Sequence, residues 1–224
     1  MENFNTYTEE DPNSVIVITS PTRIDWTDMQ ENDQAYVYKD FGVNHFNGDF
    51  EHWIDMDFGV TSNNGQFFWA LTNLVDDLID IDAASGDYLA LFASMEIDAR
   101  RHPYLMECDG GAVYSDTGNM NLPPGFLVPG TYWRIWRDEA VGTYGTIYCD
   151  IYSTAALRAA RGSGDLDRLS VALHTSKKDF RYLFPLCSAH EASATKKSTG
   201  CVENLILFEP GGPVPLGLRS GGKH

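Results

Sequence analysis

The stretch AYVYKDFGVNHFNGDFEHWIDMDFG, residues 35–59, decides the fold that the sequence predicts. It holds two strand-like patterns around a loop rich in Gly, Asn and Asp, so we interpret it as a β-hairpin. Successive side chains of a strand point to opposite faces. One face of the second strand is therefore expected to meet a core, and it carries Phe50, His52, Ile54, Met56 and Phe58. The other face is expected to meet water, a neighbouring sheet, an ion or a ligand, and it carries Glu51, Trp53, Asp55 and Asp57.

The rest of the chain continues this pattern of short strands with a period of two. In one of them Ile147, Cys149 and Ile151 are expected to face the core, whereas Tyr148, Asp150 and Tyr152 face outward. Roughly twelve or more strands with turns every eight to twelve residues predict an all-β, antiparallel two-sheet sandwich of the jelly-roll type. The only segment with a convincing helical pattern is Ser153 to Arg161, a short connector with a possible N-cap and with Gly162 behind it.

The ends of the chain differ in composition from the middle. Residues 1–14 predict an extended N-terminal arm, residues 15–209 a single β-sandwich domain, and residues 210–224 a flexible Gly/Pro-rich tail. Neither end has enough apolar side chains for a core of its own. We therefore expect both ends to be ordered only where a second copy or another chain holds them, which predicts a homo-oligomer or a larger assembly.

The formal net charge of −16 is distributed unevenly. Residues 1–98 contain twenty acidic residues against Arg23 and Lys39 alone, a balance that repels phosphate backbones and argues against nucleic-acid binding. Carboxylates are densest in the stretch VDDLIDIDAASGD, which predicts a Ca²⁺-binding loop, although solvated acids that keep the protein soluble are the alternative. The proposed ligands are Asp76, Asp77, Asp80 and Asp82, together with Asp87.

Export and membrane signals are absent from the sequence. The N-terminus is acidic and polar, and no apolar run approaches the length of a membrane span, so we expect synthesis in the cytoplasm without a signal peptide and no insertion into a membrane. The four cysteines, Cys108, Cys149, Cys187 and Cys201, are too far apart for a CxxC-type metal site. Free buried thiols are the default expectation, since three disulfide pairings remain open.

A succession of segments carries a resemblance: YKDFGVNHFNGDFEHWIDMDF, FFWALTN, DYLALF, GTYWRIWRDEA, GTIYCDIYS, LSVALHT, DFRYLF and CVENLILFE. From about Tyr36 to Glu209 the chain resembles single-domain members of the concanavalin A-like lectin/glucanase superfamily, including laminin G-like modules and proteins of phage and environmental origin. The resemblance implies two large antiparallel sheets, one of them concave, with ligands on the concave face or its loop rim. It leaves lectin, glycoside hydrolase, adhesion and virion functions open.

The glycoside hydrolase hypothesis has a definite sequence requirement. The glucanases that the chain resembles use Glu-x-Asp-x-Glu or Glu-x-Asp-x-x-Glu on a concave strand, because alternation brings the catalytic carboxyl groups to one face. Residues 96–101 begin in this way, with Glu96 and Asp98, but arginine stands at both positions where the acid belongs, Arg100 and Arg101. We therefore predict that the protein is not an enzyme and keep hydrolase activity as the alternative.

Binding is favoured by aromatic residues beside carboxylates, because sugar rings present apolar C–H faces and rims of hydroxyl groups. The predicted glycan-binding group consists of Glu51, Trp53, Asp55, Asp57, Tyr148, Asp150 and Tyr152. The alternative interpretation is that these rings pack between sheets. A third hypothesis is a structural or attachment protein on a virion surface, which agrees with the missing export signal. The sequence thus predicts a lectin-like sandwich for surface attachment or virion structure, with a glycan or a second copy as its partner.

Overall fold

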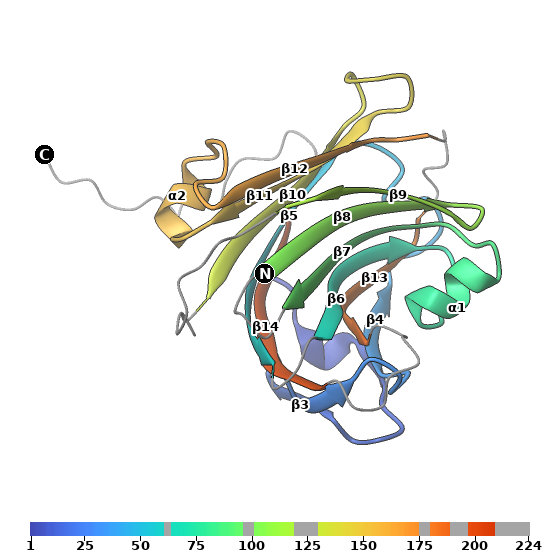
Figure 1. Cartoon of the computed structure of the whole chain (residues 1–224), viewed down its shortest axis with the longest axis vertical. Helices are drawn as coiled ribbons and strands as arrows, with labels where there is room; N and C mark the ends of the chain where they lie inside the picture. Colours follow the sequence, from blue (N-terminus) through green and yellow to red (C-terminus); the bar gives the residue numbers. More distant parts are fainter. Residues whose placement is uncertain (61–63, 96–100, 119–129, 175–179, 189–196, 209–224) are drawn as a thin grey trace, which may run out of the picture.

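In the computed structural model the chain forms a sandwich of two antiparallel sheets (Figure 1). The structure describes residues 1–60, 64–95, 101–118, 130–174, 180–188 and 197–208. Sheet A consists, in spatial order, of β1 (Thr8–Glu10), β4 (Tyr36–Asp40), β13 (Tyr182–Ser188), β6 (Asn64–Thr72), β7 (Tyr88–Met95), β8 (Arg101–Asp109) and β9 (Ala112–Thr117). Sheet B consists of β12 (Asp167–Ala172), β11 (Thr146–Tyr152), β10 (Thr131–Asp138), β5 (Phe50–Val60), β14 (Lys197–Phe208), β3 (Arg23–Gln30) and β2 (Ile16–Ser20).

The main core lies between the two sheets, and alternation along the strands fills it as predicted. On β5 the side chains of Phe50, Ile54 and Met56 are buried in this core. On β11 the side chains of Ile147 and Cys149 are fully buried on the same inner face. The predicted all-β antiparallel sandwich is therefore confirmed.

The interpretation of residues 35–59 as a hairpin is wrong. β4 pairs with β1 and β13 in sheet A, whereas β5 pairs with β10 and β14 in sheet B. The connection over residues 41–49 therefore passes from one sheet to the other instead of returning along its neighbour. Phe46 of this connection is buried in the core between the sheets, which anchors the crossing.

Residues 1–14 differ from the predicted arm because they are part of the sandwich. The 3-10 turn η1 (Phe4–Thr6) places the ring of Phe4 in the main core, where it is 0% exposed. β1 adds an edge strand to sheet A by pairing Glu9 with Val37. Tyr7 is buried in the same core, so two aromatic side chains and the pairing of β1 join this segment to the sandwich. The predicted tail, residues 210–224, lies outside the described residues.

Two short α-helices complete the described part of the fold. α2 (Ala155–Ala159) lies within the segment predicted as helical, and Thr154 caps it by accepting a hydrogen bond from the backbone N–H of Leu157. α1 (Leu78–Ala83) falls in the stretch that we predicted as a calcium-binding loop. It lies on the outer side of sheet A, away from sheet B (Figure 1).

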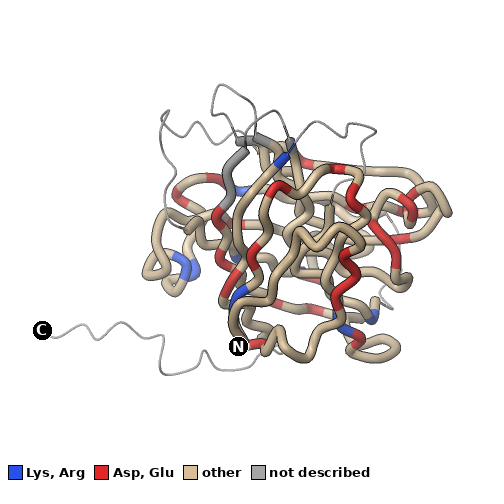
Figure 2. The backbone as a smooth tube through the Cα atoms, turned by 90° about the horizontal axis from the view of Figure 1, so that it is seen from below, with Lys and Arg blue, Asp and Glu red and all other residues tan. Residues whose placement is uncertain are grey.

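Acidic residues outnumber basic ones along most of the described chain (Figure 2). The four cysteines are free and buried, as expected. Within the described ranges, no helix combines the length and apolar character needed to cross a membrane.

A buried histidine connects the two sheets inside the core. His52 of β5 is 1% exposed, and its Nδ1 accepts a hydrogen bond of 3.0 Å from Nε1–H of Trp69 on β6. Burial, with His45 nearby, lowers the pKa of His52 to about 3. Protonation of Nδ1 would also break the bond to Trp69, since the indole nitrogen is a donor only. The folded protein therefore holds His52 neutral.

This histidine makes stability depend on pH in a predictable direction. Between its ordinary pKa of about 6.5 and its folded value, the unfolded chain binds a proton that the folded chain does not, so stability falls as pH falls. From pH 7.5 to pH 5.5 this contribution is about 1.4 kcal/mol. Denaturant unfolding at both pH values should show this loss of stability in wild type and in the exposed-site control His45→Gln, but not in His52→Gln. An equal loss in all three proteins between pH 7.5 and pH 5.5 would contradict the assignment of this pH dependence to His52.

Candidate functional site

Aromatic side chains from neighbouring strands gather on the outer face of sheet A. We call this group the aromatic face, and it consists of Tyr36 and Tyr38 of β4, Tyr182 and Phe184 of β13, Phe67 of β6, Tyr88 and Phe92 of β7, and Tyr104 of β8. Strands β6, β7 and β8 are bowed, and α1 lies on their hollow side (Figure 1). The hollow side of sheet A therefore carries the aromatic face.

One partly accessible region of the aromatic face is a set of three tyrosines. Tyr36, Tyr38 and Tyr182 are half-buried, and the rings of Tyr36 and Tyr38 contact that of Phe184. The ring centroids of Tyr36 and Tyr38 are 6.0 Å apart, and those of Tyr38 and Tyr182 are 6.1 Å apart. The set arises from alternation, because Tyr36 and Tyr38 flank the inward Val37 on β4 and β13 lies beside them in the sheet.

Charged groups border these tyrosines on two sides. Asp40 forms an ion pair with Arg181, whose guanidinium carbon lies 4.8 Å from the centroid of the Tyr182 ring. On the other side, Tyr36 lines an open pocket of about 370 Å³ together with Glu10, Asp11, Pro12, Gln34 and Asp76. Burial and the nearby carboxylates of Asp76 and Glu10 raise the pKa of Tyr36 to about 12. The tyrosine hydroxyl therefore stays protonated and able to donate a hydrogen bond.

Phe92 extends the aromatic face toward β8. Its ring centroid lies 5.1 Å from that of Phe67 and 5.6 Å from that of Tyr104. The ring folds back over Gly65, where an added Cβ would come within 2.1 Å of its Cζ atom. Glycine at this position thus lets the phenylalanine lie close against the sheet.

The predicted calcium ligands do not form a loop, because helix α1 occupies their segment. Asp77 is the N-cap of α1, and its Oδ1 accepts from the backbone N–H of Ile79 and Asp80. Asp82 receives the Sγ–H of Cys108 at 3.3 Å. Among the described residues no group of three His, Cys, Asp or Glu side chains is placed to hold a metal ion. Calcium binding by this segment stays a prediction, which melting temperatures with EDTA and with millimolar Ca²⁺ test.

The predicted glycan-binding residues share the outer face of sheet B, as alternation requires, but this face is largely closed. Trp53 and Tyr152 are each 1% exposed and Asp150 is 0% exposed, so the expectation of an exposed Trp53 ring is wrong. α2 and the residues after it cover the face, and Ala159 packs with Trp53, Ile206 and Phe208 in a small apolar cluster. Glu51, Asp57 and Tyr148 keep part of their surface accessible.

Arginines from distant segments pair with the carboxylates of this closed face. Arg158 forms an ion pair of 2.6 Å with Asp55, and its Nη1 also donates to the carbonyl of Ile54 at 3.0 Å. Burial lowers the pKa of Arg158 and raises that of Asp55 in spite of their ion pair, so the pair offsets only part of the desolvation of each group.

The other predicted carboxylates have partners as well. Glu51 contacts Arg134 at 3.1 Å and Arg161 at 2.9 Å, and its Oε1 accepts from Nε1–H of Trp53 at 2.7 Å. Asp150 lies 3.6 Å from Arg134 and 3.3 Å from Arg168. These acids therefore neutralise guanidinium groups within the protein.

Tyr148 belongs to a stack of rings and cations on the same face. Its ring is parallel to that of Trp136, with centroids 4.8 Å apart. Arg134 lies 4.1 Å from the Trp136 centroid, and Arg168 lies 5.2 Å from it. Whether this group or any other residue of the predicted set binds a glycan is untested. The incomplete glucanase motif is untested too, because residues 96–100 lie outside the described part of the chain.

Comparison with known proteins identifies the fold but no family. No family model and no curated protein matches the chain. A legume lectin-like domain from Entamoeba histolytica is similar over 92% of this chain and 90% of its own, with a TM-score of 0.53 and 12% identity. An alginate lyase in complex with alginate trisaccharide is similar over 91% of this chain and 88% of its own, with a TM-score of 0.52 and 11% identity.

A tailspike protein of bacteriophage CBA120 shares the same architecture in part of its length. The similarity covers 90% of this chain and 28% of the tailspike chain, with a TM-score of 0.51 and 12% identity. At such low identities these likenesses show the fold alone. They confirm, at the level of the fold, the resemblance of the sequence to the concanavalin A-like sandwiches.

Proposed function

We propose that the protein is a non-enzymatic glycan-binding sandwich and that the aromatic face of sheet A is its binding surface. The observation that carries this proposal is the set of three half-buried tyrosines bordered by charged side chains on a hollow sheet. The C–H faces of a sugar stack on aromatic rings, and its hydroxyl groups pair with tyrosine, carboxylate and guanidinium groups. The group of residues predicted from the sequence is a weaker candidate, because its Trp53 ring is covered.

The comparisons support the proposal without deciding it. Solved structures with this fold include a lectin-like domain and a complex with an alginate trisaccharide. The pocket of about 370 Å³ beside Tyr36 also has the size of typical small-molecule sites, about 300–1,000 Å³.

Removing a ring from the aromatic face should weaken glycan binding. A glycan array identifies a ligand for the wild-type protein, and Tyr38→Ala should bind that ligand roughly two- to tenfold less tightly, because one stacked ring contributes about 0.5–1.5 kcal/mol. Tyr38→Phe keeps the ring and should bind nearly as well as wild type. The matched control is Tyr144→Ala, which removes a tyrosine side chain that is 39% exposed and lies outside the aromatic face.

Several results would count against this site. Unchanged glycan affinity in Tyr38→Ala, or an equal loss of glycan affinity in Tyr38→Ala and Tyr144→Ala, would show that the glycan binds outside the aromatic face. Loss of binding in Trp53→Ala alone would favour the outer face of sheet B. If the bound glycan is shortened on incubation, the protein is a glycan-degrading enzyme, which is the alternative function.

The biological role that we propose is attachment to a surface, and a component of a virion is one kind of protein that has this role. Support comes from the tailspike that shares the fold. The inclusion of residues 1–14 in the sandwich removes one reason to expect a partner chain. Assembly of several copies is therefore tested by the mass of the protein in solution. Light scattering that gives a mass above that of one chain, 25.0 kDa, would favour the assembled role.

A further inference from the structure

The charged residues that line the pocket beside Tyr36 are all acidic. The pocket has a volume of about 370 Å³, and its lining consists of Tyr36 with Glu10, Asp11, Pro12, Gln34 and Asp76. Glu10 of β1 is paired with Tyr36 of β4, so a carboxylate lies beside this tyrosine in the sheet. Within the described ranges, no Lys or Arg side chain forms an ion pair with Glu10, Asp11 or Asp76. A positive group on a ligand would therefore meet no competing cation of the protein.

The basic residues closest to this pocket in the sequence are engaged by other acids. Nη2 of Arg23 lies 2.7 Å from Oδ1 of Asp25, and Nζ of Lys39 lies 2.8 Å from Oε2 of Glu2. No other Lys or Arg occurs before Arg100. The pocket therefore keeps a negative potential, which attracts cations and repels anions.

One carboxylate of the pocket has an oxygen without a hydrogen bond. Oδ2 of Asp11 accepts the backbone N–H of Ile16 at 2.7 Å, but Oδ1 is buried and accepts no hydrogen bond from the described residues. Burial and the carboxylate of Asp11 raise the pKa of Glu9, as expected for acids that repel one another. A donor that carries positive charge would satisfy Oδ1 of Asp11 and reduce this repulsion.

The ring of Tyr36 offers a contact of a second kind. An ammonium group within about 6 Å of the centroid of an aromatic ring is attracted by the negative face of that ring. The ring centroid of Tyr36 lies 6.0 Å from that of Tyr38. A sugar that stacks on Tyr38 can therefore place a substituent at the ring of Tyr36 and in the pocket beside it.

We infer that the glycan bound by the aromatic face carries a free amino group and that its ammonium group lies in the pocket beside Tyr36. This inference rests on the proposed function, since it names the class of sugar that the same surface takes. An ammonium group brings three N–H donors and a positive charge, which match the carboxylates of Glu10, Asp11 and Asp76. An N-acetylated sugar lacks this charge, and the carboxylate of a uronic acid would be repelled.

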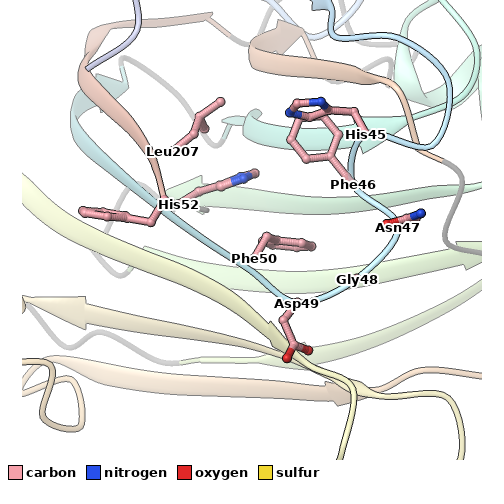
Figure 3. Close-up of a pocket in the computed structure, with 9 residues that line it drawn as sticks. His45, Phe46, Asn47, Gly48, Asp49, Phe50, His52 and Leu207 are labelled. Carbon is pink, nitrogen blue, oxygen red and sulfur yellow. The ribbon is translucent and has the colours of Figure 1, made fainter. Parts of the chain in front are cut away.

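A smaller pocket beneath the connection from β4 to β5 provides a comparison within the same protein (Figure 3). Its volume is about 160 Å³, and Asp49 is the one carboxylate in its described lining. Oδ1 of Asp49 accepts the backbone N–H of Glu139 at 2.8 Å. Asp49→Asn removes a negative charge from a pocket and keeps an oxygen that can accept this hydrogen bond. It is therefore the matched control for a charge removed beside Tyr36.

Calorimetric titration of the full chain with two probes tests the inference. The probes are a β-1,4-linked oligomer of glucosamine and the oligomer of N-acetylglucosamine of equal length, which differ only in the acetylation of their amino groups. At about pH 6 the carboxylates are ionised and the amino groups are largely protonated. The glucosamine oligomer should bind roughly tenfold more tightly, because its ammonium groups form charge-assisted hydrogen bonds. Salt at about 0.5 M should reduce this preference, since it screens accessible charges.

Four variants locate the ammonium group. Glu10→Gln and Asp76→Asn should each lower the affinity for the glucosamine oligomer roughly two- to fivefold and leave that for the acetylated oligomer nearly unchanged. The control Asp49→Asn should change neither affinity. Tyr38→Ala should weaken the binding of both oligomers, because it removes the stacking that they share.

The outcomes separate this inference from the proposed function. Equal affinity for the two oligomers, tighter binding of the acetylated one, or binding of neither would overturn the inference. A preference for the glucosamine oligomer that survives both Glu10→Gln and Asp76→Asn, or that falls equally in Asp49→Asn, would overturn it as well. The proposed function fails by a different result, the absence of binding to every glycan of the array.

Discussion

Replacing Arg158 with methionine is expected to lower the free energy of unfolding by about 3–5 kcal/mol, the usual cost of breaking a buried ion pair from one side. Arg158 is 4% exposed and lies 2.6 Å from Asp55, so Arg158→Met leaves a buried carboxylate with Asn204 as its remaining side-chain donor. Asp55, whose pKa burial already raises, would then bind a proton more readily. The loss of stability in the variant should therefore shrink as pH falls, because its folded state takes up the proton first.

Two further variants separate the buried pair from an ordinary surface charge. The double variant Asp55→Asn with Arg158→Met removes both charges and should recover part of the stability. Arg23→Met is the surface control, because the Arg23 side chain is 42% exposed and its pairs with Asp25 and Glu203 are solvated. Its effect should stay below about 1 kcal/mol. If urea unfolding gives Arg23→Met and Arg158→Met the same loss of unfolding free energy, that result would contradict the structural role of the buried pair.

Trp53→Ala is expected to cost about 3–5 kcal/mol, as truncation of a fully buried tryptophan usually does. Its ring lies 4.8 Å from that of Phe208 and 4.9 Å from the guanidinium carbon of Arg158, and Nε1–H donates to Glu51. The matched control is Trp136→Ala on the same face, where the ring is half-buried and the loss should be smaller. Melting curves and a glycan array, measured on the same variants, show whether Trp53 stabilises the fold or binds a glycan. A folded Trp53→Ala variant that has lost only glycan binding would restore this ring to the binding site.

Much of the fold follows from the sequence because alternation is a local signal. Phe50, Ile54 and Met56 face the core as their spacing predicts. The same signal does not tell which strands pair, and residues 35–59 show the consequence, since β4 and β5 lie in different sheets. Helix α1 did leave a local signal that we missed. Leu78 and Ile81 are three residues apart, and Asp77 before them caps the N-terminus of the helix. After the helix, the backbone N–H of Gly86 donates to the carbonyl of Ile81.

The candidate site was harder to predict because it depends on residues that are distant in the chain. The sequence shows the carboxylates of Glu51 and Asp55 but does not show that Arg134, Arg158 and Arg161 reach them. In the same way, Tyr36 and Tyr38 are visible as an alternating pair. Their neighbour Tyr182 joins them only through the pairing of β4 with β13.

The position of β14 affects how the protein is made. This strand is the last of the described chain, yet it lies between β5 and β3 in sheet B. A ribosome releases β5, which ends at Val60, 148 residues before β14 ends at Phe208. At about 5–20 residues per second, the nascent chain spends roughly 7–30 seconds without the strand that joins β5 to β3 in this sheet. Its strand edges remain open to chaperones and to other nascent chains throughout that time, so sheet B can be completed only after β14 has left the ribosome.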